Sequence, residues 1–306
     1  MSLRARLLEL ALRAVRLKRM LSGPDAIRRT IAMVRRQGPA LPSAAFQKRF
    51  AVSRRELAGS AIYTVAPRGR EPSRRLLYLH GGGFVMPIQA PHWHLIGTLV
   101  DRLDAVATVP FYPLAPEHDE SAIWSLLRRL YQELAGNGAA HAALPLTLAG
   151  DSAGGSLALS LAMQVRDAGW AAPARIVLIS PSLDLSGREP IPDALDRADP
   201  ILPAAGLPEI ARLYAGARDH SDPVVSPLYG SLEGLPPIAL FTGTHDILWR
   251  DCVRLRDRAA REGRPLAWFE APGMLHVWPI FPIPEARIAL DQMVQFIAGP
   301  GFRPVS

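Results

Sequence analysis

An α/β architecture, with a mostly parallel central sheet between layers of helices, is the fold class that this sequence predicts. From about residue 47, short β-like apolar runs alternate with longer helical patterns, which is typical of a parallel sheet flanked by helices. Apolar residues make up 49% of the 306 residues, enough for a large core, and charged residues only 21%, which argues against disorder. Residues 186–222 break the alternation with a stretch rich in Pro, Asp and Ala, where we expect an insertion of loops and helices above the sheet.

Each strand is expected at a short apolar run, and each helix at a longer amphipathic pattern between two such runs. The predicted strands are residues 61–65, 76–79, 106–111, 146–149, 175–179, 238–242 and 266–270. The predicted helices are residues 92–103, 120–135, 153–168, 250–262 and 284–298.

The N-terminal segment differs from the rest in pattern and charge. From Leu3 to Leu21 apolar residues recur at spacings of four and three, with arginines between them, which predicts a basic amphipathic helix. Gly23-Pro24-Asp25 ends it, and residues 26–37 predict a second basic helix. The segment lacks the uncharged stretch of a secretory signal, so we do not expect cleavage. Three interpretations stay open: a cap over a site, helices packed on the body or a partner subunit, and weak attachment to an anionic membrane surface.

The charge distribution excludes several classes of function. Residues 1–59 hold 14 Lys/Arg and 3 Asp/Glu, whereas the remaining chain has a net charge of −4, so the overall +7 belongs to the N-terminal segment. Aromatic residues are not interleaved with that charge, so we expect no nucleic-acid partner. No apolar run approaches 18 residues, so none is expected to span a membrane. The single Cys252 excludes a disulfide within the chain and predicts a reducing, cytoplasmic location.

The run Gly150-Asp151-Ser152-Ala153-Gly154-Gly155 carries the most chemistry. It follows an apolar run and opens a helical pattern, and a G-x-S-x-G between strand and helix predicts a nucleophile elbow. The glycines leave room for the sharp turn that lifts the Ser152 hydroxyl to where a base can reach it. Ser152 is therefore the predicted nucleophile.

A second motif, His80-Gly81-Gly82-Gly83-Phe84, directly follows the strand predicted at residues 76–79. Three consecutive glycines are costly in backbone entropy, which indicates a need for bare backbone. Loops of this HGGG type supply N–H groups to the oxyanion of a tetrahedral intermediate. We expect Gly82, Gly83 and Ala153, the residue after the nucleophile, to form that oxyanion hole.

With these two motifs and residues 112–118 (Tyr-Pro-Leu-Ala-Pro-Glu-His), the sequence resembles the hormone-sensitive-lipase family of α/β-hydrolases over roughly residues 60–300. Ser156 and Pro113 depart from the family pattern, which usually has Asn and Arg there. The resemblance implies an α/β-hydrolase domain at 46–306, a helical cap at 1–45 and a second cap insertion at about 186–222. It also implies hydrolysis of short- to medium-chain acyl esters.

The acid and base of a triad should follow the nucleophile in the order Asp or Glu, then His. Asp246 comes just after the strand predicted at 238–242, whereas the rival Asp251 falls inside the next predicted helix. His276 lies in the loop after the next strand, and the alternative base His245 would lack an acid behind it. We predict that His276 takes the proton of Ser152 while Asp246 orients the imidazole.

This chemistry requires no metal or organic cofactor, and the expected partner is a small-molecule ester. Phe84, Trp93 and Phe111 are the candidates for lining the substrate pocket. His80 is expected to brace the glycine loop, and His92 with His94 has an H-x-H spacing without a third ligand motif. Three alternatives remain: an amide or formamide hydrolase on the same triad, a non-catalytic ligand receptor of the same fold, and homodimer formation through an edge strand.

Overall fold

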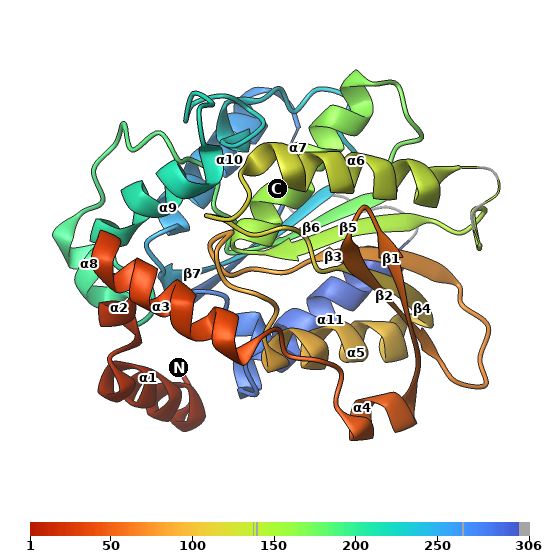
Figure 1. The fold of residues 1–306 in the computed structure, drawn as a ribbon, viewed down its shortest axis with the longest axis horizontal. Coiled ribbons are helices and arrows are strands. Elements are labelled where there is room, and N and C mark those ends of the chain that lie inside the picture. The colour runs from red at the N-terminus through yellow and green to blue at the C-terminus, as the bar shows by residue number, and fades with distance from the viewer. Residues whose placement is uncertain (137, 139, 265, 300–306) are drawn as a thin grey trace.

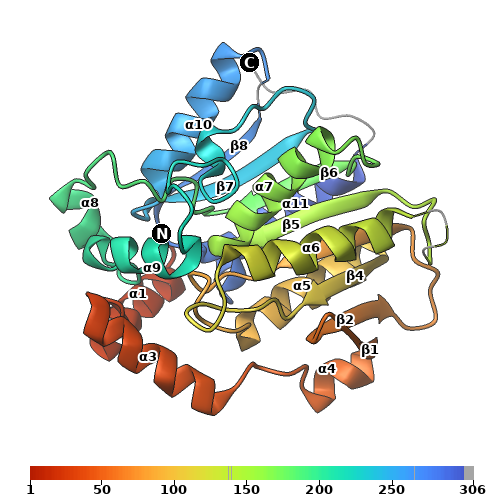
Figure 2. The same cartoon turned by 45° about the horizontal axis from the view of Figure 1, so that its top comes forward.

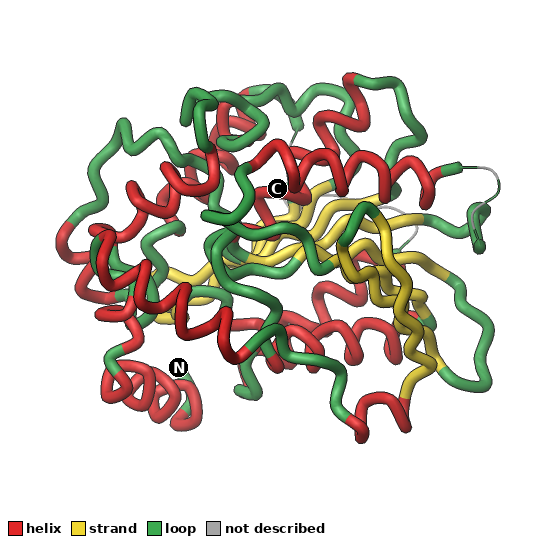
Figure 3. Tube along the Cα trace, in the orientation of Figure 1, coloured by secondary structure: helices red, strands yellow, loops and turns green. Residues whose placement is uncertain are grey.

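A central eight-stranded sheet forms the middle of the molecule in the computed structural model, which describes residues 1–136, 138, 140–264 and 266–299. The strand order is β1-β2-β4-β3-β5-β6-β7-β8, in which β3 to β8 run parallel. At one edge β2 is antiparallel to β4, and β1 is antiparallel to β2. Figures 1 and 3 show helices on both faces of this sheet. The predicted α/β architecture is therefore confirmed.

The strands are β1 Phe50–Leu57, β2 Ser60–Pro67, β3 Arg74–Leu79, β4 Ala105–Pro110, β5 Leu146–Asp151, β6 Arg175–Ile179, β7 Ile238–His245 and β8 Ala267–Leu275. The α-helices are α1 Leu3–Val15, α2 Leu17–Met20, α3 Pro24–Gln37, α4 Ala44–Arg49, α5 Ala90–Leu103, α6 Glu120–Ala135, α7 Ala153–Asp167, α8 Asp193–Ala198, α9 Leu207–Ala215, α10 Trp249–Arg261 and α11 Pro284–Ala298. All seven predicted strands and all five predicted body helices have counterparts here, with bounds that differ by a few residues.

Two hydrophobic clusters, one on each face of the sheet, form the core. In Figure 1, α6 and α7 cover one face and α5 and α11 the other. The parallel strands β3, β5 and β6 are buried on both faces, which explains why their sequences are continuous apolar runs. Because these strands are parallel, their carboxyl ends and the loops after them lie at one edge of the sheet.

The sequence did not predict β1. Its residues between Phe50 and Leu57 are almost all exposed, because it is an edge strand that pairs only with β2. An exposed edge strand has no buried face, so it carries neither an apolar run nor a clear alternation.

The helix predicted from Leu3 to Leu21 is divided into two shorter helices. α1 ends at Val15, its C-cap residue Arg16 adopts a left-handed conformation with φ 57°, and the short α2 follows. Within α1 the leucine row faces solvent, since Leu3, Leu7 and Leu10 are 73%, 56% and 62% exposed, whereas Leu21 after α2 is buried. The opposite side of α1, with Ala5 buried, packs on the core cluster of the body instead. Of the two sides of α1, the one without these leucines is therefore the packed one.

None of the helices in the described ranges has both the length and the apolar character needed to cross a membrane.

Candidate active site

Ser152 lies at the turn between β5, which ends at Asp151, and α7, which begins at Ala153. Its backbone has φ 51° and ψ −121°, a strained conformation for a residue with a side chain. Its N–H donates to the carbonyl of Ile179 at 2.8 Å, which fixes the turn against β6. A Cβ atom at Gly154 would overlap the carbonyl oxygen of Leu79, so the tight approach of α7 to the sheet requires glycine there.

The structure brings together the three side chains predicted for the triad, from segments up to 124 residues apart. His276 Nε2 lies 3.0 Å from Ser152 Oγ, and His276 Nδ1 lies 2.9 Å from Asp246 Oδ2. Asp246 is fully buried, and its Oδ1 accepts a hydrogen bond from the N–H of Leu248 at 2.8 Å. The carboxylate therefore accepts from the ring at Nδ1, which leaves Nε2 without a proton and able to accept the serine proton. His245 makes no hydrogen bond with Ser152 among the described contacts.

A second buried carboxylate, that of Asp199, lies beside Asp246. The sequence did not predict it. Asp199 follows α8 in the 186–222 insertion and is fully buried. Its Oδ1 accepts from the N–H groups of Ile201 and Leu202, and its Oδ2 accepts from the N–H of Ile247, the neighbour of Asp246. Burial, and then the charge of Asp246, raise the pKa of Asp199 to about 6. No motif marks Asp199, because the contact joins segments 48 residues apart.

The surroundings of His276 favour the protonated form of its imidazole. Burial alone would lower the pKa of His276, but the charge of Asp246, its hydrogen bond and the charge of Asp199 together raise that pKa above its usual value. The two carboxylates therefore favour the imidazolium that forms when the ring takes a proton.

The glycine loop presents backbone donors that have no partner in the described part of the chain. The N–H groups of Gly82, Gly83 and Ala153 take part in none of the hydrogen bonds there. Gly82 has φ 120°, and its carbonyl accepts from Val85 and Met86, so the loop turns back on itself. Positive φ values at Gly82 and Gly83 explain why side chains are absent at these positions.

A buried Asp–His pair holds the glycine loop against the elbow, and sequence reasoning missed this pair too. Asp151 Oδ1 accepts from the N–H of Gly81 at 3.0 Å and from the hydroxyl of Tyr78 at 2.6 Å, and Asp151 Oδ2 lies 3.2 Å from His92 Nε2. Burial opposes both charges, yet His92 lowers the pKa of Asp151 and Asp151 raises the pKa of His92. His92 therefore points to Asp151, the residue before Ser152.

His80 supports the same loop as a neutral ring. Burial and the neighbouring His92 lower the pKa of His80 to about 4. Its Nδ1–H donates to the carbonyl of Gly81 at 2.7 Å, and the ring stacks on Tyr112, whose hydroxyl donates to the His80 carbonyl.

The N-terminal helices and the 186–222 insertion pack next to the glycine loop. Leu21, Ile27 and Ile31 belong to the same buried cluster as Phe84 and Ile210 of α9. On α3, the Arg35 guanidinium donates to the carbonyls of Val85 and Ala115 and forms a two-bond ion pair with Glu117. On α1, Arg13 donates to the carbonyls of Arg197 and Ala198, directly before Asp199.

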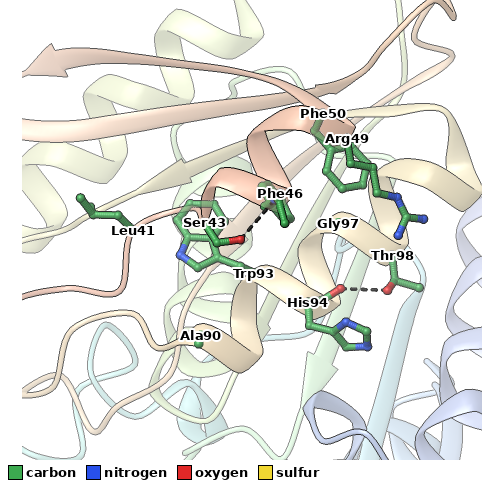
Figure 4. A pocket seen from close by; sticks show the side chains of 11 residues that line it. Leu41, Ser43, Phe46, Arg49, Phe50, Ala90, Trp93, His94, Gly97 and Thr98 are labelled. Carbon is green, nitrogen blue, oxygen red and sulfur yellow. Dashed lines mark hydrogen bonds between the residues drawn. The ribbon is translucent and has the colours of Figure 1, made fainter.

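The three predicted pocket residues lie in different surroundings. Phe84 is buried and stacks on Tyr214 with ring centroids 3.6 Å apart, so its face is already occupied. Phe111 lines a cavity of about 180 Å³ together with His80, Tyr112 and Val34; this cavity is next to the glycine loop but is lined by none of the triad. Trp93 lines another cavity of about 340 Å³, between α4 and α5, whose other lining residues include Phe46 but none of the triad (Figure 4). The structure therefore does not bring Trp93 to the predicted nucleophile.

Comparisons with known proteins agree with this geometry. The model of the alpha/beta hydrolase fold family matches residues 76–280. The chain is 34% identical over 232 residues to an acetyl-hydrolase of Streptomyces hygroscopicus, and the match covers 74% of this chain and 76% of the relative. It is 29% identical over 230 residues to an esterase of Acinetobacter venetianus, and this match covers 72% of this chain and 73% of the relative. Among solved structures, esterase EstE5 soaked with p-nitrophenyl butyrate superposes with TM-score 0.82 at 28% identity, covering 97% of this chain and 98% of that one. An esterase of the bacterial hormone-sensitive lipase family superposes with TM-score 0.79 at 26% identity and the same coverage.

Proposed function

This chain belongs to the alpha/beta hydrolase fold family, in its hormone-sensitive-lipase branch, and is a carboxylic-ester hydrolase; from that premise we propose that it is a serine esterase of short- to medium-chain acyl esters. One observation carries the proposal: the unbroken relay Ser152–His276–Asp246, with links of 3.0 and 2.9 Å. The similarity to an acetyl-hydrolase, and to an esterase soaked with a butyrate ester, supports the acyl range.

In the proposed reaction, Ser152 Oγ attacks the ester carbonyl and its proton moves to His276 Nε2. The imidazolium that results is stabilised by Asp246, with Asp199 behind it. His276 then gives the proton to the leaving alcohol, which leaves an acyl-serine. A water molecule, deprotonated by the same ring, hydrolyses the acyl-serine and restores the hydroxyl.

The oxyanion that forms at the carbonyl oxygen needs hydrogen-bond donors that are already in place. We assign this role to the unpartnered N–H groups of Gly82, Gly83 and Ala153. The hydrogen bond from Gly81 to Asp151 links the loop that supplies two donors to the elbow that supplies the third. Loss of one such donor typically lowers kcat by about 10²–10³.

We further propose that residues 1–45 and the insertion at about 186–222 act together as the cap. The support is their shared packing against the glycine loop and the contacts of Arg13 and Arg35 with the body. Phe84 and Phe111 stay proposed pocket residues, and the cavity beside Phe111 is bounded by Val34 and Arg35 of α3. The cytoplasmic location stays a prediction from Cys252.

The test is hydrolysis of p-nitrophenyl esters with acyl chains of increasing length, compared with matched anilides and formanilides. We expect turnover of acetate and butyrate esters that Ser152→Ala abolishes, with a fall for long chains. Faster turnover of the amides would make the protein an amide hydrolase on the same triad. Absence of turnover on both panels, in a folded protein, would refute the catalytic proposal and favour a ligand receptor.

A further inference from the structure

The outer face of α1 is an apolar stripe that no described part of the chain covers. Six of the eight large hydrophobic side chains that are exposed in the described ranges lie between residues 1 and 33, namely Met1, Leu3, Leu7, Leu10, Val15 and Met33. At 100° per residue, Leu3, Leu7 and Leu10 form one row along the helix. The opposite side of the helix is the packed one, so exposure of these leucines is not a result of fraying.

Positive charge borders this stripe on both sides. Residues 1–37 contain 10 Lys/Arg and 2 Asp/Glu, a net charge of +8. By the same helical spacing, Arg4 lies on one edge of the stripe and Arg6 on the other. Neither arginine, nor Arg16, forms an ion pair with a described residue, and the carboxylate of Glu9 is already bonded to Arg13. The stripe therefore has a cationic border that the body of the protein leaves unneutralised.

We infer that α1, together with the basic α3, is a docking surface for an anionic lipid bilayer. An exposed row of leucines bordered by arginines lets a helix lie in the plane of a membrane, with its apolar side among the acyl chains and its guanidinium groups at the phosphates. Each arginine near an anionic surface strengthens such binding about five-fold. Burial of the leucines and attraction of the arginines to the phosphates both act on α1, and neither requires a change in the fold.

A second copy of this chain fits the surface less well. Two-fold pairing of the leucine stripes would place the cationic border of one copy against that of the other. The only carboxylates within residues 1–37 are Glu9 and Asp25, and Glu9 is engaged by Arg13. An anionic bilayer supplies both an apolar phase for the leucines and negative charge for the arginines, so it is the partner that we propose.

The surface lies next to the insertion that we propose as the second part of the cap. Figures 1 and 2 show α1 and α3 together on the side of the molecule that also carries α8 and α9. Lys18 of α2 donates to the carbonyl of Asp199 and pairs with Asp196 of α8. A docked bilayer would therefore bring esters that are dissolved in it close to the cap. This consequence rests on the proposed function, whereas the docking itself does not.

The test is co-flotation of the full chain with vesicles of phosphatidylcholine alone and of phosphatidylcholine and phosphatidylglycerol in equal parts. We expect binding to the anionic vesicles only. The variant Leu3→Ser/Leu7→Ser/Leu10→Ser should lower the partition coefficient on the order of 1,000-fold, because each of the three leucines contributes about ten-fold when it is fully withdrawn from water. The variant Arg4→Gln/Arg6→Gln/Arg16→Gln should lower it about 100-fold as well.

Two matched variants serve as controls, and both should bind vesicles as the wild type does. Leu41→Ser removes an equally exposed leucine outside α1, and Arg54→Gln/Arg55→Gln/Arg129→Gln removes three exposed cations outside residues 1–37.

Several results would overturn the inference. One is absence of binding to anionic vesicles, and another is equal loss of binding in the control variants. A third is a wild-type dimer in sedimentation that the leucine variant converts to a monomer, without any change in vesicle binding. Ser152→Ala should float like the wild type, so failure of docking and failure of the proposed catalysis are separate outcomes.

Discussion

Replacing Asp199 by asparagine tests whether the second buried carboxylate takes part in the proton transfer. The substitution removes the negative charge behind Asp246 and leaves one oxygen to accept a backbone N–H. At pH values above about 6, Asp199 is ionised and stabilises the imidazolium of His276. Its removal therefore lowers the pKa of His276, and the acid limb of the pH profile of kcat/KM should move to lower pH. A nearby charge shifts a pKa by one to three units, and we expect the lower end, about one unit.

The same substitution should change the free energy of unfolding very little. The pKa of Asp199 is about two units above that of an aspartate in the unfolded chain. At neutral pH, ionisation of Asp199 therefore destabilises the native state by about 3 kcal/mol. This cost disappears at pH values below the pKa of the unfolded aspartate, where the group is protonated in both states. Asparagine removes this cost. However, its amide NH₂ then faces the backbone N–H of Ile247, or those of Ile201 and Leu202, and the hydrogen bonds from these N–H groups to a charged oxygen, worth about 1.5–3 kcal/mol, are lost. The two effects nearly cancel.

The assay is kcat/KM for p-nitrophenyl acetate across the acid limb, with urea unfolding measured in parallel. The matched control is Asp196→Asn, which removes a carboxylate from α8, the short helix just before Asp199, but from a side chain that pairs with Lys18. The control should leave the acid limb in place. Superposition of the Asp199→Asn profile on that of the wild type, with the fold intact, would refute the role assigned to Asp199.

Three further predictions concern the relay and its supports. Asp246→Asn should lower kcat by about 10⁴ while circular dichroism stays unchanged, because the imidazole loses its orienting acceptor; a loss below ten-fold would exclude Asp246 as the acid. His92→Gln should destabilise the protein by about 3–5 kcal/mol in urea unfolding, since it leaves Asp151 buried without its cation, and the difference should shrink as pH rises through the raised pKa of His92. Arg35→Met should lower the unfolding free energy by about 1–3 kcal/mol, because α3 loses its hydrogen bonds to the carbonyls of Val85 and Ala115. It should also raise KM for longer esters more than for acetate. An equal change in KM for all esters of the series would argue against α3 as part of the cap.

Much of the fold and of the candidate site was predictable from local sequence. Buried parallel strands are continuous apolar runs, so β3, β5, β6 and β7 were found with nearly correct bounds. The elbow at Ser152 and the glycine loop are contiguous motifs whose conformations demand glycine. The loops after parallel strands share one sheet edge, so the triad order and the positions of Asp246 and His276 just after predicted strands were enough to predict that both would lie near Ser152.

The sequence by itself determined the sheet, the two glycine motifs and the order of the relay, because each depends on residues that are close in the chain or on the parallel direction of the strands. Tertiary structure alone decided that Asp199 lies behind Asp246, that His92 pairs with Asp151, and that the leucines of α1 face outward. These contacts join segments dozens of residues apart or depend on how a helix is rotated about its axis. A helix that is apolar on two sides, as α1 is, gives no local signal of which side the body will cover.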